Sequence, residues 1–132
     1  MSLVIDASVV TKWVLDEDGS DRANALRGEI DLIAPSLLAA EVGSAIWKAV
    51  RRRSIPRAEA LAAVGAILLP FDRLVPNEEL HSRALEIAID VSHPIYDCFY
   101  IALAQRENAP IVTADECMLA AAEKARVKAR ML

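Results

Sequence analysis

The stretch Leu3-Val4-Ile5-Asp6-Ala7-Ser8, near the amino terminus, decides the fold class. Its three apolar residues are typical of a short strand that is buried on both faces. The apolar spacing that follows, from Val9 to Val14, predicts a helix. A buried strand that leads directly into a helix is typical of an α/β protein, and it places Asp6 at the carboxyl end of the strand.

The same alternation of strand and helix continues along the rest of the chain. Further strands are predicted over 32–34, 71–75, 110–113 and 127–131, and further helices over 21–27, 36–53, 56–69, 77–90, 95–105 and 116–124. Strands that alternate with helices favour one central, mainly parallel sheet flanked by helices in a three-layer α/β fold. Ligand sites of such folds gather at the carboxyl ends of the strands.

The composition limits the class of protein. A chain of 132 residues, 55% of them hydrophobic, is long enough for one domain with its own core, so we treat 1–132 as a single domain. Its two cysteines, Cys98 and Cys117, lack the paired spacing of a zinc or redox motif. Their apolar surroundings predict ordinary buried thiols in a reducing compartment.

No segment predicts secretion or membrane insertion. The first apolar stretch is interrupted at Asp6, and the apolar run 61–71 falls short of the ~20 residues that span a bilayer. We therefore expect a cytoplasmic protein with no membrane partner. The net charge of −4 argues against a generic polyanion binder. It does not exclude RNA, because cations bound to clustered acids reverse the local potential.

Four of the nineteen acidic residues lie in apolar surroundings: Asp6, Glu41, Asp97 and Asp115. The other acids lie in polar or amphipathic stretches, where solvated surface is the default interpretation. A basic partner or a helix cap would explain any one of the four taken alone. Four together favour a shared divalent cation, because burying carboxylates without partners is costly.

A site of this kind predicts a particular chemistry. Mg²⁺ and Mn²⁺ prefer oxygen ligands, and such ions polarise phosphoryl oxygens and activate water, so the expected reaction is phosphodiester hydrolysis. The histidines, His81 and His93, are isolated in the pattern and are interpreted as a helix-surface residue and a turn residue. The chain has no Gly-Lys-Ser/Thr phosphate loop, so nucleoside triphosphate hydrolysis has no support.

Four ordered segments extend the pattern over nearly the whole chain. They are 4–10 with 12–13, 34–42 with 45–48, 93–97 with 100–104, and 109–115. In this order they resemble the PIN-domain ribonucleases, and most closely the VapC-type toxins of toxin–antitoxin pairs. The resemblance implies a parallel sheet flanked by helices, a Mg²⁺ or Mn²⁺ cofactor, and hydrolysis of single-stranded or looped RNA. It implies that the catalytic residues and metal ligands are Asp6, Glu41, Asp97 and Asp115.

The resemblance also suggests neighbours for these acids. Ser8 and Thr113 become candidates for contact with metal-bound water or substrate. Many relatives have an asparagine three residues after the glutamate, where this chain has Ser44, a third candidate. The basic residues Lys48, Arg51, Arg52 and Arg53 are candidate contacts for RNA phosphates or for the acidic residues of a partner. A solvated helix end explains these basic residues equally well.

Such toxins are usually encoded beside a protein antitoxin and commonly form homodimers, so the resemblance implies both partners. Trp13, Trp47 and the apolar helix 61–69 are candidates for such surfaces, but we expect them in the core.

Two other functions stay open. One is a non-catalytic PIN-like module that holds RNA or protein. The other is an aspartyl-phosphate phosphotransfer protein, which also places acids and Mg²⁺ at strand ends. The segment Asp6-Ala7-Ser8 lacks the second acid expected there, and no obvious lysine follows a late strand.

Overall fold

The computed structural model describes residues 1–29 and 31–132. Five strands form one sheet in the order β3-β2-β1-β4-β5, and every neighbouring pair is parallel. They are β1 (Leu3–Ile5), β2 (Leu32–Pro35), β3 (Arg73–Val75), β4 (Ile111–Thr113) and β5 (Ala129–Met131). The predicted parallel α/β architecture is confirmed.

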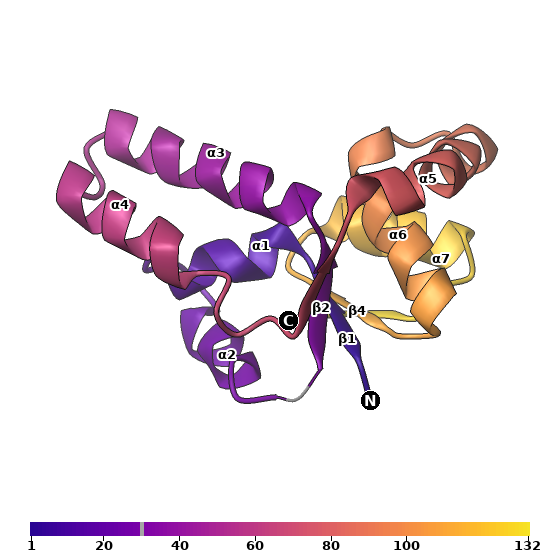
Figure 1. The fold of residues 1–132 in the computed structure, drawn as a ribbon, viewed down its shortest axis with the longest axis horizontal. Helices are drawn as coiled ribbons and strands as arrows, with labels where there is room; N and C mark the ends of the chain where they lie inside the picture. Colours follow the sequence, from indigo (N-terminus) through magenta and orange to yellow (C-terminus); the bar gives the residue numbers. More distant parts are fainter. Residues whose placement is uncertain (30) are drawn as a thin grey trace.

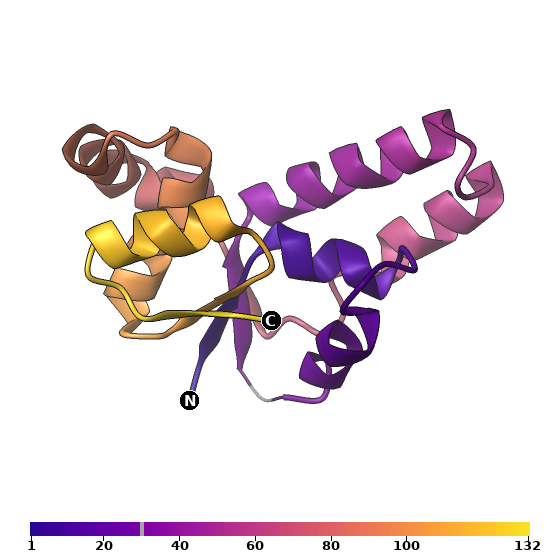
Figure 2. The same cartoon turned by 180° about the vertical axis from the view of Figure 1, so that it is seen from behind.

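Helices cover both faces of this sheet (Figure 1). On one side lie α1 (Ala7–Val10), the 3₁₀ turn η1 (Thr11–Trp13), α2 (Ser20–Leu26), α3 (Leu37–Arg51) and α4 (Arg57–Ala66). On the other side lie α5 (Asn77–Val91), α6 (Ile95–Glu107) and α7 (Glu116–Lys124). The view from behind shows the same three layers and the α3–α4 hairpin extending away from the sheet (Figure 2). Within the described residues, no helix combines the length and apolarity needed to cross a membrane.

The first helix is shorter than the sequence predicts. It ends at Val10 and continues as the tighter turn η1 instead of running as one helix to Val14. The Thr11 hydroxyl donates to the Ser8 carbonyl oxygen at 3.1 Å, a local bond that competes with regular helix geometry in a β-branched run.

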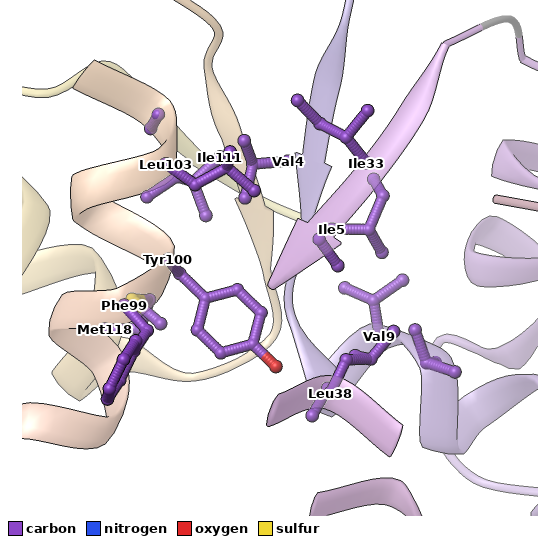
Figure 3. Packing of buried hydrophobic residues seen from close by; sticks show 14 of the residues in the cluster. Val4, Ile5, Val9, Ile33, Leu38, Phe99, Tyr100, Leu103, Ile111 and Met118 are labelled. Atoms are coloured by element: carbon purple, nitrogen blue, oxygen red, sulfur yellow. The ribbon is translucent and has the colours of Figure 1, made fainter. Parts of the chain in front are cut away.

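The core is centred on the inner strands and on α6. Val4 and Ile111 are fully buried in the neighbouring strands β1 and β4. Seven consecutive residues of α6, 98–104, are buried, as expected for a helix covered on all sides. Figure 3 shows Tyr100 of α6 among these side chains, with its hydroxyl oxygen pointing toward the part of the chain that carries Leu38 of α3. This helix therefore lies at the centre of the molecule.

The α3–α4 hairpin exposes large apolar side chains, so the expected core position is wrong for Trp47 and for much of helix 61–69. Trp47 is 57% exposed and Leu61 is 59% exposed. The hairpin extends beyond the sheet, which leaves one of its faces without a layer to pack against (Figure 1). Trp13 is half-buried, and its indole Nε1 donates to the Ala23 carbonyl oxygen at 2.7 Å.

The two cysteines differ in their environment. Cys98 is buried in α6, as expected, whereas Cys117 is exposed in the first turn of α7. The prediction of a buried thiol is therefore wrong for Cys117, because the first turn of α7 presents that position to solvent.

Candidate active site

The strand order singles out one edge of the sheet. The chain passes from β1 to β2 and β3 on one side, and later places β4 and β5 on the other side of β1. In parallel sheets, the carboxyl ends of the strands at such a reversal form the crevice that binds ligands. Asp6 directly follows β1, and Asp115 follows β4 by two residues. Both acids therefore lie at the expected edge.

Asp6 is buried, with 5% of its surface exposed. Its Oδ2 atom accepts hydrogen bonds from Ser8 Oγ and from Thr113 Oγ1, both at 2.7 Å. Burial raises the pKa of Asp6, the two hydroxyls lower it, and the nearby carboxylate of Asp97 raises it. The two hydroxyls thus stabilise the ionised form of a carboxylate that its surroundings disfavour.

The backbone orients these hydroxyls. Ser8 Oγ accepts from the Ala114 N–H at 2.9 Å, and Thr113 Oγ1 accepts from the Asp115 N–H at 3.0 Å. Because each hydroxyl accepts a backbone hydrogen, its own hydrogen is directed to Asp6. The structure therefore places Ser8 and Thr113, two of the predicted neighbours, against this acid. Ser44, the third, is exposed on α3 and does not share in these bonds.

Glu41 reaches the same region from the second turn of α3. Its Oε1 accepts a 2.7 Å hydrogen bond from the hydroxyl of Tyr100, which α6 carries on the other face of the sheet. The pKa of Glu41 is raised to about 7: burial is the largest cause, the Tyr100 bond acts in the opposite direction, and the charges of Asp6 and Asp97 raise the pKa further. Three acids from different elements therefore influence one another.

Sequence reasoning missed Tyr100. Burial raises its pKa well above the usual value, and the nearby carboxylates Glu41, Asp6 and Asp97 add to this effect, so the hydroxyl stays protonated. A signal was present: the hydroxyl-bearing Tyr100 lies within an apolar stretch three residues after Asp97, and residues at this spacing share a helix face.

Asp97 lies in the first turn of α6, as predicted, where the positive end of the helix dipole favours a carboxylate. Its Oδ2 lies 2.6 Å from Nε2 of His93. The interpretation of His93 as only a turn residue is therefore incomplete, because its side chain contacts a predicted site acid. His81 is exposed on α5, as expected, and its ring stacks on Phe99 with a centroid distance of 6.1 Å.

Asp115 stays at the margin of this group. It is half-buried, and its Oδ1 caps α7 by accepting from the Cys117 N–H at 2.9 Å. Its charge is not among the causes that shift the pKa of Asp6 or Glu41. Across residues 1–29 and 31–132, no three His, Cys, Asp or Glu side chains are already close enough to enclose an ion. The structure thus brings Asp6, Glu41 and Asp97 together more loosely than a closed metal cage, with Asp115 beside them.

The donor set nevertheless fits a hard divalent cation. Within the described chain, no lysine or arginine forms an ion pair with Asp6, Glu41 or Asp97. Carboxylates that share an edge without a cationic partner are stabilised by a bound cation, and oxygen donors suit Mg²⁺ or Mn²⁺. Burial first, and then the charges of neighbouring carboxylates, raise the pKa values of Asp6 and Glu41, and a nearby cation would oppose both effects.

The four basic candidates are exposed near the distal end of α3. They are Lys48, Arg51, Arg52 and Arg53. The Arg51 guanidinium lies over the ring of Trp47, 5.3 Å from its centroid, and Arg52 Nε donates to Ser54 Oγ at 3.1 Å. The helical rise of ~1.5 Å per residue puts Lys48 about 10 Å and Arg51 about 15 Å along the helix from Glu41. These charges therefore lie along α3 at a distance from the acidic edge.

Comparison with known proteins identifies the family. The model of the PIN domain matches residues 3–124, so the chain belongs to the PIN-domain family. Among curated relatives, Ribonuclease VapC1 of Mycobacterium tuberculosis is 37% identical over 124 residues, which cover 89% of each chain. The inferred resemblance is confirmed.

Two crystal structures share the fold. PAE2754 from Pyrobaculum aerophilum aligns with a TM-score of 0.77 at 21% identity, covering 99% of this chain and 90% of that one. VapC20 of Mycobacterium tuberculosis, described as a sarcin-ricin loop cleaving toxin, aligns with a TM-score of 0.71 at 17% identity, covering 91% and 95%.

Proposed function

We propose that this chain is a metal-dependent ribonuclease that hydrolyses phosphodiester bonds in single-stranded or looped RNA, as the toxin of a toxin–antitoxin pair. One observation carries the proposal: Asp6, Glu41 and Asp97 gather at the carboxyl edge of the sheet in a PIN domain, and within residues 1–29 and 31–132 none of them pairs with a lysine or arginine. The relative VapC1, named a ribonuclease and matched over 89% of its length, supports RNA as the substrate.

We assign the cation to Asp6, Glu41 and Asp97, with Asp115 contributing from the margin through the oxygen that does not cap α7. A bound Mg²⁺ or Mn²⁺ supplies a Lewis acid for the phosphoryl oxygen and makes a coordinated water more acidic. The chain's own task is to keep these carboxylates ionised and aimed at one point.

Neutral donors perform that task. Ser8 and Thr113 hold Oδ2 of Asp6, and Tyr100 holds Oε1 of Glu41. Each bond favours the ionised carboxylate while leaving the second oxygen of the acid for another partner. Because these hydroxyl donors are neutral, they fix the orientation of the carboxylates and leave the negative charge of each carboxylate available to a cation.

We assign the RNA backbone to Lys48, Arg51, Arg52 and Arg53. They are exposed, and α3 carries them at a defined distance from Glu41. Contacts to phosphates position a nucleic acid without reading its sequence, so these residues should raise affinity for all RNA sequences alike.

Protein partners are the second part of the proposal. We propose that this chain binds a protein antitoxin and forms a homodimer. Trp47, Leu61 and Val64, exposed by 57%, 59% and 48%, line an apolar groove of about 240 Å³ between α3 and α4. Contiguous exposed apolar surface is typical of protein interfaces, and we assign this groove to the antitoxin. We also propose a cytoplasmic location, where an RNA substrate is available.

The experiment is cleavage of single-stranded RNA by the purified protein. We expect cleavage with Mn²⁺, none with EDTA, and a loss of about 100-fold or more in Asp6→Asn, the scale on which a preorganised charge acts. The exposed Asp21→Asn in α2 is the matched control and should leave cleavage unchanged. RNA binding without cleavage would favour the non-catalytic module, and labelling of Asp6 by acetyl phosphate would favour phosphotransfer.

A further inference from the structure

His93 lies at the junction of α5 and α6, and its ring nitrogen Nε2 is 2.6 Å from Oδ2 of Asp97. We propose that His93 is a positioning residue, which holds the Asp97 carboxylate in the orientation that receives the cation. This inference rests on the proposed function, because it gives Asp97 the role of a ligand.

The backbone of His93 is fixed from both sides. Helix α5 ends at Val91, and Ser92 adopts the left-handed conformation with φ of 55°. The His93 N–H then donates to the Ala88 carbonyl oxygen at 3.1 Å, the bond of a Schellman motif. Pro94 follows, and its ring restricts the backbone at the start of α6. The backbone that carries the imidazole is therefore held in place before any ligand arrives.

The contact also has a defined polarity. An ionised carboxylate only accepts hydrogen bonds, so the hydrogen lies on Nε2 of His93. The side chains of His93 and Asp97 are 19% and 22% exposed, which shields the bond from much of the solvent. With Oδ2 engaged, rotation of the Asp97 carboxylate is restricted and Oδ1 is left for another partner. His93 thus acts on the site through Asp97.

The other two acids are held in the same manner. Hydroxyl donors engage one oxygen of Asp6 and one oxygen of Glu41, as His93 engages one oxygen of Asp97. Outer partners that orient metal ligands typically change metal affinity by about 10–100-fold when they are removed. His93 completes a set in which each central acid has its own donor.

The test is Mn²⁺ binding by RNA-free protein, measured by calorimetry. His93→Leu should weaken Mn²⁺ binding about 10-fold or more, whereas His93→Gln, whose amide can donate, should stay within about 3-fold of wild type. Unfolding in EDTA should be nearly unchanged in both variants, because the backbone bond to Ala88 remains. His81→Leu, the other histidine, is the matched control and should bind Mn²⁺ as wild type does.

The Mn²⁺ affinities of these variants show whether the His93 side chain positions Asp97 through its hydrogen bond. Wild-type affinity in His93→Leu would overturn the positioning role. Equal weakening in His93→Leu and His93→Gln would also overturn it, because the shape of the turn and not the hydrogen bond would then matter. Failure of the proposed function looks different: wild-type protein would not bind Mn²⁺, or Asp97→Asn would bind it as well as wild type.

Discussion

Replacing Glu41 with glutamine should stabilise the metal-free protein at alkaline pH, although it removes a proposed metal ligand. Burial is the largest cause that raises the pKa of Glu41 from 4.5 to about 7. Between these values the folded protein keeps a proton that the unfolded chain releases, so stability falls as pH rises through this window. Glutamine has no charge to bury, and its carbonyl oxygen can still accept the hydrogen bond from Tyr100.

The size of the effect follows from the pKa. A rise in the pKa of Glu41 from 4.5 to about 7 corresponds to a loss of about 3 kcal/mol of folding stability at high pH. Glu41 is partly exposed, and screening by solvent lowers this expected loss to about 1–3 kcal/mol. The free energy of unfolding of Glu41→Gln, relative to wild type, should therefore rise by this amount between pH 4.5 and pH 8. Asp6→Asn should act in the same direction, because burial also raises the pKa of Asp6.

Urea denaturation in EDTA at the two pH values measures the effect, with the exposed Glu123→Gln in α7 as the control. At pH 8, saturating Mn²⁺ should make wild type more stable than Glu41→Gln. An ion at about 100 times its dissociation constant stabilises the wild-type protein by about 2.7 kcal/mol. A stability difference between Glu41→Gln and wild type that does not change with pH would refute the argument from burial.

Three further substitutions test the donor to Glu41, the role of Asp115 and the basic end of α3. Tyr100→Phe removes the hydroxyl donor that lowers the pKa of Glu41, so Mn²⁺ should bind about 10-fold more weakly at pH 7, as measured by calorimetry. Unchanged Mn²⁺ affinity would show that Tyr100 does not contribute to the site. Asp115→Ala removes the cap of α7, so urea denaturation should show a loss of about 1 kcal/mol of stability. Asp115→Asn keeps an oxygen that can cap the helix. If Asp115→Asn is as stable as wild type but cleaves RNA more slowly, Asp115 is a metal ligand. Arg51→Ala should weaken RNA binding equally for different sequences and reduce the slope of log affinity against log salt by about 0.7, whereas a sequence-dependent loss would contradict a phosphate contact.

Local sequence was sufficient to predict the strands and the acids that follow them. Short apolar runs with an acid at the end, such as 3–6 and 111–115, carry both signals at once. The topological reversal then places Asp6 and Asp115 at one edge without any knowledge of side-chain contacts. Asp115 shows the limit of this reasoning, because the same position also suits a helix cap.

Contacts between distant segments were beyond the reach of sequence patterns. Tyr100 and Glu41 are 59 positions apart, and their bond exists only because α3 and α6, from opposite faces of the sheet, approach each other at its carboxyl edge. Asn77 Oδ1 likewise caps α3 by accepting from the Leu37 N–H at 2.9 Å, across 40 positions. No single-sequence pattern links such residues.

The exposed hairpin illustrates a different ambiguity. The apolar spacing around Trp47 and Leu61 is the same for a helix that packs in the core and for a helix whose apolar face is exposed to solvent or to a binding partner. Only the position of α3 and α4 beyond the sheet distinguishes the two cases (Figure 1).

The shared metal site is tested most directly by an anomalous difference map from crystals of this protein soaked with Mn²⁺. We expect a peak at about 2.0–2.3 Å from carboxylate oxygens of Asp6 and Asp97, with Glu41 either bound directly or linked through water. The same soak of Asp6→Asn crystals should show a weaker peak or none. A peak on another face of the molecule, or one that persists unchanged in Asp6→Asn, would contradict a shared metal site at the carboxyl edge of the sheet.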